Sequence, residues 1–279
     1  MRRVGAGVIQ KTVRELCIKA NLELRGDVLS ALRRAKKKET SARAIRMLDI
    51  IIYNALIAKK KRLPICQDTG MVVVYLDVGQ DVLIKGDLKK AVEKGVLDAY
   101  REGYFRKSIV SDPLIRRNTD TNLPPVIYTR IVPGRKIGVS VVVKGFGCEN
   151  ASRTKMFRPT DPMSLIQDFV ADIIKELGSK ACPPMYIGIG IGGTLDKAVS
   201  LSKEATLRPV GESSKSRHIA RLEKDILKKL NKLRIGPMGV GGKTTALGVS
   251  ILTYPTHIAG LPVAVNISCH ATRDARITI

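Results

Sequence analysis

Four of the five cysteines stand at the ends of apolar runs or in turns rich in glycine and proline. In the clearest case, Cys66 is followed by an amide, a carboxylate and a hydroxyl, those of Gln67, Asp68 and Thr69. The β-branched run at 71–76 comes directly after them and predicts a buried strand. Polar groups beside a buried strand need partners. This arrangement favours a functional site, although a turn with a capping aspartate and a core cysteine also fits.

The same two interpretations, a functional site or a structural residue, apply to the other cysteines. Cys148 follows an apolar run in a glycine-rich segment, Cys182 precedes two prolines and an apolar run, and Cys269 ends one. Glycine near a cysteine lets the backbone approach a ligand closely, which favours a functional site. Alternatively, each of these cysteines is a small apolar residue buried in the core. Cys17 instead falls on the apolar side of a predicted helix and is expected in the core. The stripe that carries it consists of Ile9, Val13, Leu16, Cys17 and Ala20.

Two common cysteine roles are disfavoured. The number of cysteines is odd, which argues against a disulfide framework, and no CxxC pair supports a zinc ribbon or finger.

Two glycine-rich segments imitate nucleotide-binding motifs. Residues 188–193 fit GxGxxG, but a dinucleotide site also needs an acidic residue at the end of a second strand, and the following region reads as a helix. Residues 236–244 resemble a phosphate-binding loop, but Pro237 stands where that motif requires glycine. Neither motif is accepted, although the second segment can still present N–H groups to an anion.

Composition limits the class of protein. The 279 residues with 44% hydrophobic content suffice for one large or two modest domains. The net charge of +24 suggests nucleic acid as a partner, but aromatic residues make up only 4% and tryptophan is absent, so single strands lack a stacking platform. A solvated basic surface is favoured and nucleic acid disfavoured. With neither an apolar span nor a signal peptide, a cytoplasmic protein is expected.

The elements that position these residues alternate between the two periodicities. Residues 7–60 predict helices with an interruption at 25–27, and the stripe Leu48, Ile51, Ile52, Ala55 and Leu56 should face the core. Strands are expected at 72–76, 126–132, 137–143, 186–191, 249–254 and 262–268, and helices at 87–104, 161–177, 195–206 and 214–233. The prediction is one α/β domain over 1–279, with 1–62 mainly helical and 63–279 α/β.

Taken together, the segments form a pattern that resembles a known family. In chain order they are residues 64–70, 118–124, 144–147, 181–184 with 192–194, 241–243, and 268–269. They resemble the class I (iron–sulfur) fumarate hydratases and the closely related L-tartrate dehydratases. The resemblance implies a helical N-terminal part packed on an α/β body with mixed sheets. The chain ends at Ile279, about where single-chain members continue into a second, swivelling domain, as expected for the α subunit of the two-subunit form.

The resemblance also implies a cofactor. Cys66, Cys182 and Cys269 match the three cysteines that hold a [4Fe-4S] cluster in the family. Three thiolates for four irons leave one iron open to act as a Lewis acid. Cys148 stands where the family usually has serine, and it is not expected to be a ligand.

The same comparison assigns roles to other residues. Asp68 and His257 are expected to be catalytic, and Gln67, Asp68, Arg106, Gly147 and His257 to bind substrate. A guanidinium at Arg106 suits a substrate carboxylate. From the sequence alone His257 would more often be structural.

The implied function is a hydro-lyase subunit that reversibly hydrates fumarate to (S)-malate, a reaction of the tricarboxylic acid cycle. L-tartrate dehydratase is the alternative, since no motif separates the two substrates. A different class, a basic nucleic-acid-binding protein with a structural cluster, also stays open. The expected partners are a dicarboxylate and a β subunit that carries the swivelling domain, in a hetero-oligomer with no membrane attachment.

Overall fold

The computed structural model describes all 279 residues and divides them into two compact units. The first unit consists of Met1–Arg25, Ala55–Phe146 and Arg273–Ile279, and the second of Gly26–Asn54 and Gly147–Thr272. Both are mixed α/β units, which confirms the predicted fold class. That the two act as a single catalytic domain stays a prediction.

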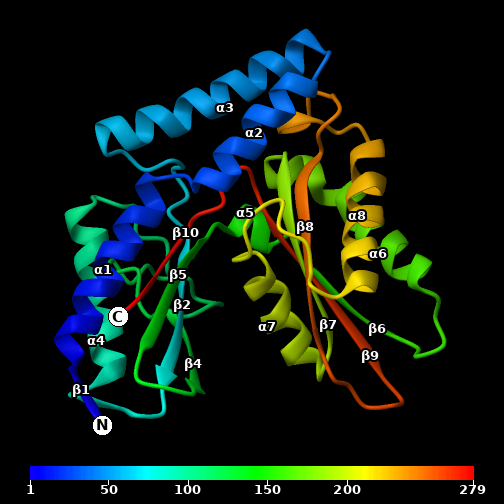
Figure 1. Cartoon of the computed structure of the whole chain (residues 1–279). Helices are drawn as coiled ribbons and strands as arrows, with labels where there is room; N and C mark the ends of the chain where they lie inside the picture. The colour runs from blue at the N-terminus through cyan, green and yellow to red at the C-terminus, as the bar shows by residue number, and fades with distance from the viewer. The chain divides into compact units, whose positions relative to one another are not determined.

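The first unit is built on a four-stranded sheet with the order β10-β5-β2-β4 (Figure 1). The strands are β2 (Met71–Gly79), β4 (Val126–Val132), β5 (Ile137–Lys144) and β10 (Asp274–Thr278). In this sheet β2 and β4 are the only neighbouring strands that pair in parallel. A second, two-stranded sheet pairs β1 (Arg2–Gly5) with β3 (Val82–Lys85).

Helices α1 (Ala6–Leu22) and α4 (Leu88–Glu102) pack on each other, and α1 also packs on β5 and β10. Alternate residues of β2 and β5, such as Val72, Val74 and Val141, face this helical layer and form one core with it. Cys17 lies in that core with no exposed surface, as predicted. Helix α4 begins at Asp87, whose carboxylate accepts the N–H of Lys90 at 3.0 Å. This hydrogen bond lowers the pKa of Asp87.

The second unit contains a four-stranded sheet with the order β6-β9-β7-β8. The strands are β6 (Arg153–Phe157), β7 (Met185–Gly192), β8 (Ala246–Tyr254) and β9 (Leu261–Ser268). The only neighbouring strands that pair in parallel are β7 and β8. Helices α6 (Met163–Leu177) and α8 (Arg217–Lys232) pack on one face and α7 (Leu195–Ala205) on the other (Figure 1). The other helical segments are α2 (Gly26–Lys38), α3 (Ala42–Lys61), α5 (Phe146–Glu149), η1 (Gly178–Ala181) and η2 (Pro237–Gly239).

The GxGxxG segment has a packing role. Ile187 and Ile189 of β7 enter the core beneath α6 and α8, so Gly188 and Gly190 face the opposite side. A Cβ atom on Gly188 would lie 2.1 Å from the carbonyl oxygen of Ser202, and one on Gly190 2.0 Å from that of Ala198. The glycines therefore allow α7 to lie directly against the strand.

The second glycine-rich segment, residues 236–244, donates a backbone hydrogen bond to a carboxylate of this chain, that of Glu39. Glu39 accepts the N–H of Lys243 at 2.6 Å and that of Thr40 at 2.9 Å. Burial by itself would raise the pKa of Glu39, but these N–H donors lower it below its ordinary value. A phosphate-binding role for the loop is therefore not needed to explain its glycines.

Helix α3 (Ala42–Lys61) corrects one prediction. Leu48, Ile51 and Ala55 are buried as expected, and Ile52 is partly buried. Leu56 is 43% exposed, because the apolar residues of this helix exceed the width of its buried face.

No helix of the structure has both the length and the apolar character that crossing a bilayer would require.

Candidate functional site

The first unit places Cys66, Gln67 and Asp68 in the loop that leads into β2. Several polar side chains hold the end of this loop. The hydroxyl of Tyr100 donates to the carbonyl oxygens of Thr69 and Gly70, and the side-chain amide of Asn122 donates to that of Gly70 at 3.2 Å. The loop is therefore fixed from two sides by buried groups.

Tyr100 can hold the loop by donating hydrogen bonds because its hydroxyl does not easily ionise. It has no exposed surface and packs edge-on against Phe105, with the ring centroids 5.5 Å apart. Burial raises the pKa of its hydroxyl well above the ordinary value. The hydroxyl therefore remains a hydrogen-bond donor throughout the neutral and mildly alkaline range.

Asp68 has a defined orientation. Its Oδ1 accepts the N–H of Gly70 at 3.0 Å, and its Oδ2 accepts the N–H of Phe146 at 2.8 Å. The carbonyl oxygen of Asp68 accepts a hydrogen bond from the guanidinium of Arg273. Three separate chain segments thus meet at this residue, and two backbone N–H groups fix the orientation of its carboxylate.

The expected substrate-binding residues Gln67 and Arg106 both have exposed side chains. The carbonyl oxygen of Arg106 accepts the hydroxyl of Thr69, which joins the backbone at Arg106 to the loop that carries Asp68. The structure therefore brings Gln67, Asp68 and the backbone of Arg106 together within the first unit.

The second unit places Cys182 and Cys269 at the same end of its sheet. Tyr186, near the start of β7, pairs with Ser268 at the end of β9. Cys182 stands shortly before the first of these residues and Cys269 directly after the second. His270 joins the two loops, because its Nδ1 lies 2.9 Å from the carbonyl oxygen of Cys182.

The Cys182 loop is held by further contacts. Cys182 has a left-handed backbone, with φ of 50°, and the carbonyl oxygen of Pro183 accepts the N–H of Met238 at 2.8 Å. Cys148 donates its thiol to the carbonyl oxygen of Ala181 at 3.6 Å. Cys148 is buried, and its thiol contacts the residue that precedes Cys182 in the chain. That Cys148 is not a cluster ligand stays a prediction.

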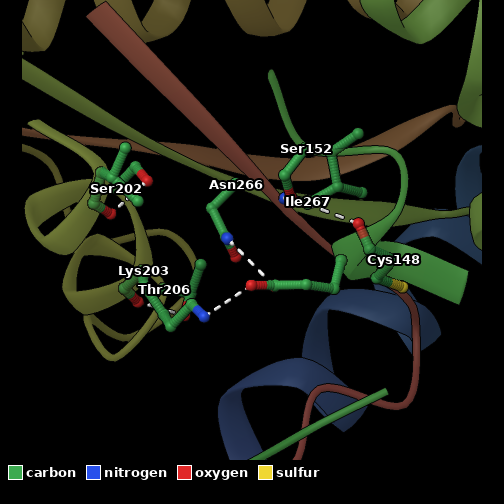
Figure 2. A network of polar contacts seen from close by, with 9 residues as sticks. Cys148, Ser152, Ser202, Lys203, Thr206, Asn266 and Ile267 are labelled. Carbon is green, nitrogen blue, oxygen red and sulfur yellow. Dashed lines mark hydrogen bonds and ion pairs between the residues drawn. The ribbon is translucent and has the colours of Figure 1, made fainter. Parts of the chain in front are cut away.

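A polar network holds the segment that carries Gly147 and Cys148 (Figure 2). Lys203 of α7 forms an ion pair of 2.6 Å with Glu149, and the amide of Asn266 on β9 donates to the same carboxylate at 3.4 Å. Ser152 accepts the N–H of Ile267 at 3.3 Å and donates to the carbonyl oxygen of Cys148 at 3.2 Å. The network joins this segment to both α7 and β9, and leaves Gly147 exposed.

His257 lies elsewhere in the second unit. It stands in the exposed turn between β8 and β9, where its Nδ1 accepts the N–H of Ala259 at 3.2 Å. Cys269 stands at the other end of β9, roughly 25 Å away at the rise of an extended strand. The structure therefore does not bring His257 beside Cys182 and Cys269.

Three residues of the first unit that support the loop leading into β2 were not predicted from the sequence: Tyr100, Asn122 and Arg273. Asn122 does lie in one of the segments on which the family resemblance rests. Tyr100 has the sequence pattern of an ordinary core residue in a helix, and Arg273 is one of 49 basic residues. Only the folded chain shows that all three hold the residues around Asp68.

The three expected cluster ligands suit iron in their chemistry. Cys66, Cys182 and Cys269 form no disulfide and have partly exposed side chains in loops, whereas Cys17 and Cys148 are buried. Thiolates are the usual ligands of iron–sulfur clusters. Neither unit by itself gathers three cysteine, histidine or carboxylate side chains into a metal-binding group. The donor set nevertheless fits an iron–sulfur cluster in its chemistry.

Comparison with known proteins agrees with this description. The profile of the family described as fumarate hydratase (Fumerase) matches residues 10–278. A Methanocaldococcus jannaschii protein, provisionally named L(+)-tartrate dehydratase subunit alpha, is 41% identical over 274 residues, which cover 96% of both chains. L(+)-tartrate dehydratase subunit alpha of Escherichia coli K12 is 29% identical over 261 residues, which cover 91% of this chain and 84% of the relative. This chain therefore belongs to the fumarate hydratase (Fumerase) family and is a hydro-lyase.

Proposed function

We propose that this chain is the cluster-bearing α subunit of a hydro-lyase that reversibly hydrates fumarate to (S)-malate. Membership of the fumarate hydratase family supports the reaction class. The observation that carries the cofactor proposal is the pair of partly exposed thiols, Cys182 and Cys269, at one end of one sheet. Cys66 is the third ligand in this proposal, and a [4Fe-4S] cluster is the cofactor.

When bound, a cluster with three thiolate ligands supplies a Lewis acid that favours the loss or addition of hydroxide. Asp68 faces the substrate hydroxyl in this proposal and can accept its hydrogen bond. Its orientation is fixed in advance by the N–H groups of Gly70 and Phe146. Such a fixed acceptor needs little rearrangement during the reaction.

The remaining proposed residues bind and orient the dicarboxylate. Arg106 has an exposed guanidinium that can bind a carboxylate with two parallel hydrogen bonds. Gln67 can contribute its amide and Gly147 its backbone N–H, and both residues are exposed. A catalytic role for His257 remains part of the proposal, although the contacts within the second unit do not support it. Replacing His257 with Asn and measuring kcat decides whether it takes part.

L-tartrate is the second candidate substrate. It is favoured by the names of the relatives from M. jannaschii and E. coli, which are those of L(+)-tartrate dehydratase subunits. Tartrate carries one hydroxyl more than malate, and a site that binds this hydroxyl would reject the analogue without it.

The names of the same relatives support a partner. Each is described as a subunit alpha, and the alignment covers 96% of this chain and of the M. jannaschii relative. We propose that a β subunit completes the site by binding the second carboxylate and placing a base near the C–H bond. This chain alone should therefore bind iron but turn over substrate slowly.

One experiment tests both substrate and partner. The chain is produced alone and with its β subunit, purified anaerobically, and assayed with malate, fumarate and L-tartrate. We expect turnover only in the joint preparation, with one substrate preferred by kcat/KM. Equal turnover by the chain alone would exclude the shared site, and no turnover of any of the three substrates by the iron-loaded assembly would exclude the function.

A further inference from the structure

Arg273 is a buried cation with an unusual set of partners. The residue is only 5% exposed and stands immediately before β10 in the first unit. Its guanidinium donates to the carbonyl oxygen of Asp68. This neutral acceptor uses one of the five N–H donors of the side chain.

The structure shows no carboxylate within ion-pair distance of Arg273. The adjacent acid, Asp274, forms its ion pair with Arg25 at 2.7 Å. The Asp68 carboxylate is directed towards the N–H groups of Gly70 and Phe146. Buried arginines are normally paired with an anion, since an uncompensated charge is costly away from water.

The guanidinium is nevertheless close to Asp68, because both side chains pack on Gly145. A Cβ atom on Gly145 would lie 3.0 Å from Nη2 of Arg273 and 3.0 Å from Oδ2 of Asp68. The absence of a side chain at this position lets the two groups occupy the same face of the backbone. The positive charge of Arg273 therefore stands beside the carboxylate proposed to face the substrate.

A dicarboxylate that approaches Asp68 is repelled by the negative charge of the Asp68 carboxylate. Two carboxylates placed side by side repel each other, and the cost rises when water is excluded. A fixed cation next to Asp68 offsets this repulsion and can bind the incoming carboxylate through its unused donors.

We propose that Arg273 binds a carboxylate group of the substrate beside Asp68, as the buried counterpart of the exposed Arg106. This inference rests on the proposed function, because it assumes a dicarboxylate and a site at Asp68. It adds a binding residue that neither the family resemblance nor the sequence pattern indicated.

The test is a binding measurement that needs no turnover. Succinate has two carboxylates but neither a hydroxyl nor a double bond, so it can bind without reacting. It is titrated calorimetrically into the anaerobic, iron-loaded assembly of the wild type and of Arg273→Gln, Arg273→Lys and Arg276→Gln. Arg276 is the matched control, since it stands on β10 with an exposed side chain and its replacement also removes one positive charge.

We expect Arg273→Gln to weaken succinate binding at least tenfold, about 1.4 kcal/mol. Arg273→Lys should weaken binding less, because it keeps the charge but loses the two-pronged geometry. Arg276→Gln should change the affinity less than about twofold, the size of effect expected of a screened surface charge. Iron content confirms that each variant is loaded.

Three results would overturn the inference: unchanged affinity in Arg273→Gln, an equal loss in Arg276→Gln, or no succinate binding by the wild type. If Arg273→Gln fails to assemble, Arg273→Lys decides, and an unchanged affinity for succinate in that variant contradicts the proposal. A wild type that binds succinate but turns over no dicarboxylate would contradict the proposed function and leave the binding role of Arg273 intact.

Discussion

The five cysteines differ in exposure, and that difference predicts which of them bind iron. Burial raises the pKa of the Cys17 thiol far above its ordinary value, so this residue does not form the thiolate that a metal requires. Cys148 is buried and donates to Ala181. The other three are partly exposed in loops.

Serine variants of all five cysteines test this division. Replacing Cys66, Cys182 or Cys269 should reduce bound iron to background, because a [4Fe-4S] cluster with two thiolate ligands is poorly held. Cys17→Ser and Cys148→Ser serve as controls and should retain iron. Iron and acid-labile sulfide per chain are the measurements. Retention of iron by Cys182→Ser together with its loss from Cys148→Ser would refute the ligand assignment.

Arg106→Lys tests the exposed cation. The substitution retains the charge but not the planar fork that fits a carboxylate. We expect KM to rise by about tenfold, equivalent to one charge-assisted hydrogen bond, with iron content unchanged. Steady-state kinetics measure the effect. Unaltered kinetics would place Arg106 on the solvated basic surface.

The residue types in the sequence predicted part of the candidate site but not the residues that hold it in place. The sequence predicts Cys66 and Asp68 as site residues because they belong to a polar segment that directly precedes a buried strand. Tyr100 and Arg273 do not, since a helical tyrosine and one more basic residue look ordinary in the sequence. Their roles depend on hydrogen bonds between segments far apart in the chain.

At the scale of elements, the contact between β7 and α7 depends on two glycines. Gly190→Ala would place a Cβ atom 2.0 Å from the carbonyl oxygen of Ala198, so α7 must move away from the sheet. We expect a loss of at least about 2 kcal/mol in the free energy of unfolding. Denaturant titration measures it.

Gly7→Ala in α1 provides the control, because nothing lies within 4 Å of its added Cβ atom. That variant should be neutral or more stable by up to about 1 kcal/mol. Equal stability of Gly190→Ala and the wild type would show that the helix does not rest on the strand as described.

Glu39 connects the start of α3 to the glycine-rich loop, and its effect should depend on pH. Hydrogen bonds lower its pKa below the ordinary value of 4.5. Its stabilising contribution is therefore present above that value and is lost as the pH falls through the lower, folded-state pKa. Glu39→Gln should cost about 1–3 kcal/mol at neutral pH and progressively less in acid.

Unfolding of Glu39→Gln and wild type at several pH values measures this difference. Glu212→Gln is the control, since Glu212 is exposed. A stability difference between Glu39→Gln and wild type that does not vary with pH would contradict the ionised interaction.

Elements with strong periodicity were predicted well, and short edge strands were not. Strand β4 was predicted at its observed bounds, and β9 within one residue at its start. Strands β1, β3, β6 and β10 were missed because each has only four or five residues and carries charged side chains. Such strands form when a neighbour supplies their hydrogen bonds, which no local pattern records.

At the scale of the whole molecule, the chain returns to its first unit after completing the second. Residues 273–279 supply β10 and Arg273 to the unit that begins at Met1. Cys66 belongs to that unit, and Cys182 and Cys269 to the other. Sequence spacing could not relate these cysteines, so the proposal that they hold one cluster rests on the family resemblance.

The central claim is that hydro-lyase activity depends on a cluster held by this chain. The direct measurement compares turnover with the amount of bound iron in the anaerobic assembly. Both are measured before the cluster is removed, after its removal, and after the cluster is rebuilt with ferrous iron, sulfide and a thiol reductant. We predict that activity is proportional to iron, falls in air and returns on rebuilding. Full activity in iron-free protein would contradict the account.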